Sequence, residues 1–77
     1  MRMPFLEREI IVVAPELDAA AAWRMMQRES IRHLLVMRGS TLVGMISDRD
    51  LLARGHWRHG ALELDPKLLI VHAMSPA

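Results

Sequence analysis

The chain has 77 residues, a formal net charge of +1 and no cysteine, and 4% of its residues are aromatic. This length allows one small domain or part of a larger one, and the missing thiols exclude a disulfide framework and a thiolate metal site. The charge is too small for a strong field toward nucleic acid or anionic membrane, and no apolar run approaches the ~20 residues of a membrane-spanning helix. We expect a cytoplasmic domain of helices and small sheets, completed by association with another copy or module.

The first half of the chain predicts a strand, a helix and a second strand. Residues 1–9 show little periodic pattern and are expected to form an N-terminal arm. The β-branched apolar run 10–13 is typical of a buried strand. The alanine-rich segment 17–29 predicts a helix, with Asp18 as its N-cap. Residues 34–37 are again apolar, and the segment 33–37 predicts the next strand.

A hairpin and a short helix are predicted next. Gly39 supplies a turn between 33–37 and a third strand at 42–46, so we expect these two strands to pair antiparallel. Residues 47–54 follow without a break and predict a short helix that ends at Gly55.

The last part of the chain predicts a loop and a linker helix. Residues 55–64 are largely polar and are expected to form a mobile loop. Asp65 followed by Pro66 is a favourable helix start, because Asp caps and Pro fits the first helical position. The helix would carry residues 68–74 and end before Pro76.

This order predicts an α+β fold with the succession strand, helix, strand, strand, helix, followed by the linker helix. The helical crossover favours parallel pairing of the first two strands, and the hairpin adds an antiparallel strand. The expected result is a three-stranded mixed sheet with two helices on one face. The other face of the sheet then needs a cover.

Ser47 and Asp50 lie three residues apart where the third predicted strand enters the short helix. This spacing fits a capping box, in which the hydroxyl and the carboxylate each accept from a backbone amide at the helix start. The same geometry suits a nucleotide, with Ser47 donating a hydrogen bond to a phosphate and Asp50 accepting hydrogen bonds from the hydroxyls of a ribose. On the spacing alone the cap is the better interpretation, because capping boxes are common and nucleoside sites are not.

Arg32 and His33 open the strand that is expected to pair with the strand leading to Ser47. If the hairpin forms, the position of these two groups relative to the helix start allows contact with a phosphate. The alternative is that strand alternation sends one side chain to solvent and the other to a helix edge. For either residue alone, this alternative is favoured.

The segment 54–59 allows two further hypotheses, and a solvated loop is favoured over both. His56 and His59 have no third metal ligand nearby in the sequence. Trp57 lies among basic residues, but one aromatic side chain in a nearly neutral chain is weak support for nucleic-acid binding. The sequence also lacks a cysteine nucleophile and a convincing Ser-His-Asp arrangement, so we do not predict an enzyme.

Several short motifs follow one another in a consistent order between residues 10 and 54. They are Ile11-Val12-Val13, Pro15, Ala22, Met26, Ile31-Arg32-His33-Leu34-Leu35-Val36, Gly39, Leu42-Val43-Gly44-Met45-Ile46-Ser47 and Asp50-Leu51-Leu52. This set resembles the CBS domain, the regulatory module named after cystathionine beta-synthase. Residues 71–76 also resemble the opening of a second copy of the motif. The resemblance therefore implies an arm at 1–9, one CBS motif at 10–64, and a linker with the start of a second motif at 65–77.

The resemblance implies a site for AMP, ADP, ATP or S-adenosylmethionine in a cleft between paired motifs, with no other cofactor required. Ser47 would contact the phosphate and Asp50 the ribose hydroxyls, with Arg32 and His33 as further phosphate contacts. Leu35 stands where the family usually has proline, and at position 47 threonine is commoner. The base would lie against the apolar residues Ile11, Val12, Leu35 and Ile46.

The function predicted from this resemblance is a regulatory module that senses an adenine nucleotide or another adenosyl ligand. Its expected partner is a second CBS motif, in a homodimer or in tandem, and neither nucleic acid nor direct membrane insertion is expected. The alternative is a ligand-free module that only holds two subunits together.

Overall fold

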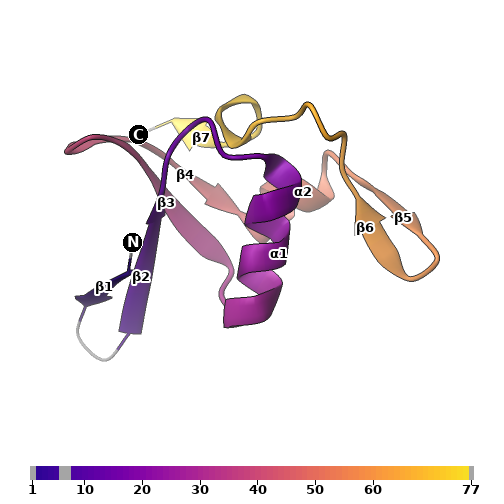
Figure 1. Ribbon diagram of the computed structural model, residues 1–77, viewed down its shortest axis with the longest axis horizontal. Helices are drawn as coiled ribbons and strands as arrows, with labels where there is room; N and C mark the ends of the chain where they lie inside the picture. Colours follow the sequence, from indigo (N-terminus) through magenta and orange to yellow (C-terminus); the bar gives the residue numbers. More distant parts are fainter. Residues whose placement is uncertain (1, 6–7, 77) are drawn as a thin grey trace.

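The computed structural model describes residues 2–5 and 8–76 and has an α+β fold (Figure 1). Its main sheet has five strands in the order β1-β2-β3-β4-β7. The helices are α1 (Ala19–Glu29) and α2 (Asp48–Leu52), and a short 3-10 turn, η1 (Ile70–His72), lies near the end of the chain. The strands of the main sheet are β1 (Arg2–Phe5), β2 (Arg8–Val13), β3 (His33–Arg38), β4 (Thr41–Ser47) and β7 (Ser75–Pro76).

The mixed pairing predicted from the sequence is confirmed. The crossover through α1 makes β2 and β3 parallel, and β3 and β4 form the antiparallel hairpin. In the β3–β4 register, Leu34 lies opposite Ile46 and Leu35 lies opposite Met45. Two strands that were not predicted extend the sheet, with β1 antiparallel to β2 and β7 antiparallel to β4.

One apolar core lies between the two helices and one face of the sheet. Along β3, the buried Leu34 and Val36 alternate with the half-buried Leu35, so this strand buries only one face. The small alanine side chains of α1 allow the helix to pack closely on that face. The buried core residues are Ile11, Ala19, Ala22, Met26, Leu34, Val36, Ile46, Leu51 and Ile70.

The expected N-terminal arm is corrected by the structure. Residues 2–5 form β1, and β2 begins at Arg8 rather than at Ile10. Strand β1 pairs with the outer edge of β2, which would otherwise leave a row of backbone groups without partners. The rest of the arm, residues 1, 6 and 7, lies outside the described residues.

The expected irregular loop at 55–64 contains a β-hairpin instead. Strands β5 (His56–Arg58) and β6 (Ala61–Glu63) pair antiparallel and extend away from the main sheet (Figure 1). The two residues between them, His59 and Gly60, both have positive φ, 51° and 79°. A type I′ turn requires this conformation at both central residues, and its twist matches that of the flanking strands.

The linker helix predicted within 65–77 does not form over the described residues, where η1 is the only helical turn. The backbone of this segment bonds to the loop before α1. Ala19 N donates to the Leu68 carbonyl at 2.8 Å, and Ile70 N donates to the Leu17 carbonyl at 2.9 Å. These long-range hydrogen bonds hold residues 68–70 against the loop before α1, so the segment forms one short 3-10 turn instead of a continuous helix and ends in β7.

Both helices are short, and none in the described part of the chain is long and apolar enough to cross a membrane. Helix α1 begins after Asp18, as predicted, although this side chain makes no capping hydrogen bond. Helix α2 ends at Leu52, with Ala53 in a right-handed conformation at φ −67°, so the predicted end at Gly55 is wrong. Gly55 instead permits close approach of β6, because a methyl group there would lie 2.8 Å from Leu62 Cδ1.

An exposed ion pair ties the loop before α1 to the end of β3. Arg38 Nη1 donates to Glu16 Oε1 at 2.6 Å, and this hydrogen bond lowers the pKa of the Glu16 carboxyl. Because the folded-state pKa is depressed, any stabilisation from the pair is present above the ordinary pKa of glutamate and is lost as the pH falls through the folded value. Both side chains are exposed, so water screens the interaction.

We predict that Ile70→Ala lowers the free energy of unfolding by about 2–5 kcal/mol, because the side chain is fully buried and its truncation leaves a cavity. Val71→Ala is the matched control in the same turn. Val71 is 37% exposed, so its truncation should cost less than about 1 kcal/mol. Equilibrium urea unfolding measures both values. Equal losses in the two variants would contradict a core role for η1.

Candidate functional site

A complete capping box forms where β4 enters α2. Ser47 is the N-cap, and its Oγ accepts from Asp50 N at 3.2 Å. In return, Asp50 Oδ2 accepts from Ser47 N at 2.8 Å. Both residues are partly buried. The helix has only five residues, too few to be stable by themselves, so the cap and the buried Leu51 hold it in place.

The cap leaves part of the hydrogen-bonding capacity of both side chains unused. A serine hydroxyl that accepts one hydrogen bond can still donate its own proton, and an ionised carboxylate has two oxygens. Within residues 2–5 and 8–76, no partner is recorded for Asp50 Oδ1. A donor at Ser47 and an acceptor at Asp50 therefore remain at the junction. These are the groups that a phosphate and a ribose hydroxyl respectively require.

The two basic residues predicted for the site lie beside this junction. His33 is the direct cross-strand partner of Ser47, and directly opposite residues project to the same face of a sheet. The Arg32 carbonyl accepts from Asp48 N at 2.9 Å, which fixes the start of β3 against the first turn of α2. Both basic side chains are exposed. The hairpin register therefore brings Arg32, His33, Ser47 and Asp50 together.

The four apolar residues predicted to contact a base are divided between two environments. Ile11 and Ile46 are core residues, 7% and 0% exposed, on the face covered by the helices. Val12 and Leu35 are direct partners across β2 and β3 and are only half-buried, on the opposite face. No helix of the described residues covers this opposite face, so among the four predicted residues only Val12 and Leu35 are open to a ligand.

Met45 belongs to this open face, and the sequence reasoning missed it. It lies directly opposite Leu35, so Val12, Leu35 and Met45 form one row across three strands. Met45 is 45% exposed, and Leu42 is 48% exposed on the same strand. The signal that could have found it was alternation, since Met45 stands two residues before Ser47 and shares its face of the strand. We call Val12, Leu35, Leu42 and Met45 the open-face residues.

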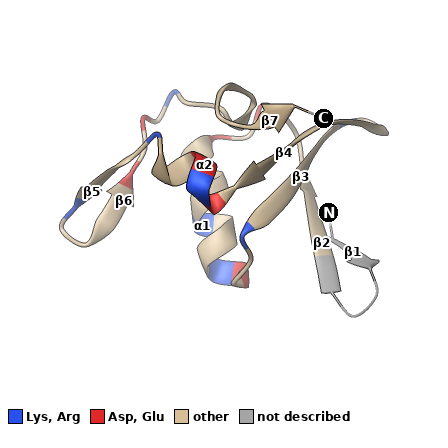
Figure 2. Cartoon of the chain, turned by 180° about the vertical axis from the view of Figure 1, so that it is seen from behind, with Lys and Arg blue, Asp and Glu red and all other residues tan. Residues whose placement is uncertain are grey.

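The charges around the junction do not form a patch of one sign. Helix α2 has both acidic and basic positions, because Asp48, Arg49 and Asp50 are consecutive (Figure 2). Specific hydrogen bonds, rather than a general positive field, must therefore provide any selectivity for a phosphate here.

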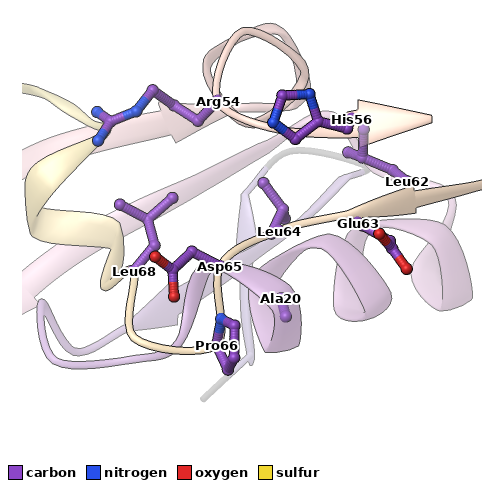
Figure 3. A pocket seen from close by; sticks show the side chains of 9 residues that line it. All are labelled: Ala20, Arg54, His56, Leu62, Glu63, Leu64, Asp65, Pro66 and Leu68. Carbon is purple, nitrogen blue, oxygen red and sulfur yellow. The ribbon is translucent and has the colours of Figure 1, made fainter. Parts of the chain in front are cut away.

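An open pocket of about 750 Å³ lies away from this junction, between α1, the β5–β6 hairpin and the segment before η1 (Figure 3). None of the predicted ligand-binding residues lines it. Acidic as well as basic side chains surround it, so it is poorly suited to a phosphate. Its lining residues are Ala20, Arg54, His56, Leu62, Glu63, Leu64, Asp65, Pro66 and Leu68.

The residues that suggested a metal or nucleic-acid site lie in the β5–β6 hairpin. His56 is in β5, whereas His59 is in the turn, and the described part of the chain has no group of three His, Asp or Glu side chains that could hold a metal ion. Trp57 is 64% exposed and makes a T-shaped contact with Trp23, with the ring centroids 6.4 Å apart. This contact anchors the hairpin to α1.

Comparison with known proteins identifies the family. A family model for the CBS domain matches residues 5–56. Three solved structures have the same fold. A CBS domain matches with a TM-score of 0.72 and 20% identity, over 88% of this chain and 51% of that chain. The CBS-pair protein CBSX2 from Arabidopsis thaliana matches with a TM-score of 0.67 and 25% identity, over 88% of this chain and 52% of that chain, and the cytosolic domain of the Mg2+ channel MgtE in complex with ATP matches with a TM-score of 0.62 and 20% identity, over 87% of this chain and 25% of that chain.

The chain spans about half the length of the first two of these structures. No curated protein matches it. The family model covers more than half of the chain, and its match agrees with the resemblance seen in the motifs. The chain therefore belongs to the CBS domain family.

Proposed function

We propose that this CBS motif is a non-catalytic regulatory module that binds an adenosyl ligand at the β4–α2 junction. One observation carries the proposal. The capping box leaves two hydrogen-bonding groups unused, the hydroxyl proton of Ser47 and Oδ1 of Asp50, and both lie next to Arg32 and His33. A nucleotide needs this combination of a donor and cations for phosphate and a carboxylate for ribose. The structure of the MgtE cytosolic domain with ATP supports the choice of an adenosyl ligand for this fold.

In this proposal the phosphate lies near Ser47, Arg32 and His33, and the Asp50 carboxylate accepts hydrogen bonds from the ribose hydroxyls. The base lies against Val12 and Leu35, with Met45 as a further contact. Ile11 and Ile46 act from the other face, where their burial fixes the positions of the strands. AMP, ADP, ATP and S-adenosylmethionine all carry the adenosyl group that this arrangement would bind.

The proposal also includes a second CBS motif that covers the open face. The open-face residues are apolar, and a core of this size gains stability from association. CBSX2 is a CBS-pair protein, and this chain matches 52% of it, which supports one motif of a pair. A ligand between two motifs would favour one of their mutual arrangements and thereby signal to an attached effector. The rival function is the same pairing with an empty cleft.

We predict that Asp50→Asn weakens nucleotide binding roughly tenfold to hundredfold, because a charged hydrogen bond to the ribose is lost. The asparagine carbonyl can still accept from Ser47 N, so the cap is retained. Asp48→Asn is the control with the same charge change, since Asp48 Oδ1 accepts from Arg49 N in its own turn and has no other partner among the residues that the structure describes. Calorimetric titration with AMP, ADP, ATP and S-adenosylmethionine measures the affinities.

Two outcomes would contradict the site. The absence of heat with all four ligands would favour the ligand-free rival. Equal weakening by Asp50→Asn and Asp48→Asn would indicate a general charge effect instead of a ribose contact.

We predict that the chain forms a dimer through the open face and that Met45→Glu weakens this dimer at least about tenfold, because an unpaired carboxylate would be buried. Leu52→Glu is the control, since Leu52 is also exposed and apolar, at 37%, but lies in α2. Light scattering over a range of protein concentrations, with and without ATP, measures the association. A chain that stays monomeric at all concentrations would contradict homodimer formation, and a dimer indifferent to ATP would support the rival.

A further inference from the structure

The segment 70–76, which we call the strap, is held directly by β4. Met45 pairs with Ser75 and Gly44 pairs with Pro76, so the strap lies on the edge of the strand that leads to Ser47. The approach is so close that it requires glycine. A methyl group at position 44 would lie 2.5 Å from the Ser75 carbonyl oxygen and 2.9 Å from Met74 Sδ.

The strap is also held by Arg54, which lies in the turn directly after α2. Arg54 Nη1 donates to the His72 carbonyl at 2.8 Å. Figure 3 shows the Arg54 side chain directed away from His56. The strap therefore contacts β4 at Gly44 and Met45, and it contacts the turn that directly follows α2 at Arg54.

The other end of the strap is fixed independently of the junction. Ile70 is fully buried, and its amide donates to the Leu17 carbonyl at 2.9 Å. Val71 N donates to the Pro15 carbonyl at 3.2 Å. By contrast, the two residues of β7 that the structure describes are both exposed. Exposed pairings open at a lower free energy than a buried anchor does, so we expect the strap to open first where it pairs with β4.

We infer that the strap is the output element of the candidate site: it docks when β4 and α2 are held together and releases when they separate. This inference rests on the proposed function. A ligand that contacts Ser47 at the end of β4 and Asp50 in α2 holds the same two elements in the same mutual position. Ligand binding and strap docking therefore stabilise one another, and thermodynamic linkage makes the effect reciprocal. An effector that contacts residues 72–76 would receive the signal.

The test uses hydrogen exchange of the amides at 72–75 together with calorimetric titration of ATP. We expect ATP to slow exchange of these amides about fivefold or more. Gly44→Ala and Arg54→Ala each release one attachment, so each should speed strap exchange and weaken ATP binding by a similar factor, although neither residue contacts the ligand. Arg49→Ala is the control, because Arg49 is an exposed cation of α2 whose side chain makes no hydrogen bond or ion pair to the described part of the strap. Unchanged strap exchange in a chain that binds ATP would overturn the inference, as would wild-type affinity in both variants.

A ligand-free measurement separates this inference from the proposed function. Ser47→Ala removes the cap that joins β4 to α2, so it should speed strap exchange about fivefold or more without any nucleotide. Ser40→Ala, in the exposed β3–β4 turn, should leave strap exchange unchanged. If ATP gives no heat, the proposed function fails and this measurement alone decides the coupling. Equal exchange in Ser47→Ala and the wild type would then overturn the inference.

Discussion

The antiparallel pairing of β3 with β4 is the constraint on which the rest of the structure depends. Its register sends Leu34 and Ile46 into the core and leaves Leu35 and Met45 on the open face. The next pair along, His33 with Ser47, lies where the strand becomes a helix. A slip of one residue would exchange the two faces and would separate the basic residues from the capping box. The fold and the candidate site are therefore consequences of the same register.

The capping box and a ligand site are compatible at this junction because they use different atoms. The cap needs an acceptor from Ser47 and one carboxylate oxygen from Asp50. A nucleotide needs the hydroxyl donor and the other carboxylate oxygen. The cap also fixes both side chains before any ligand arrives, which reduces the entropy that binding would cost. A structural role for the two residues thus favours a binding role.

Local sequence signals predicted the elements that hold this junction. The apolar run of β2, the alanine-rich α1, the β3–β4 hairpin and the Ser47 cap are each encoded by neighbouring residues, and all are present. The motif resemblance then predicted the family correctly, and it grouped Ser47 and Asp50 with Arg32 and His33, which the register brings together. Whether Ile11 and Ile46 can contact a base depends on the face of the sheet to which each strand directs these side chains. An apolar run without alternation does not reveal that orientation, and both residues are in the core.

By itself, the sequence determined the family, the succession of the central elements and the cap, because these depend on periodicity and on residues a few positions apart. Only the tertiary structure decided the fate of the last segment. Asp65 and Pro66 favour a helix start, yet hydrogen bonds to Pro15, Leu17 and Ala19 hold the chain against the loop before α1, and only the short turn η1 forms. No local pattern records partners about fifty residues away, and the same holds for the close approach that makes glycine necessary at position 44.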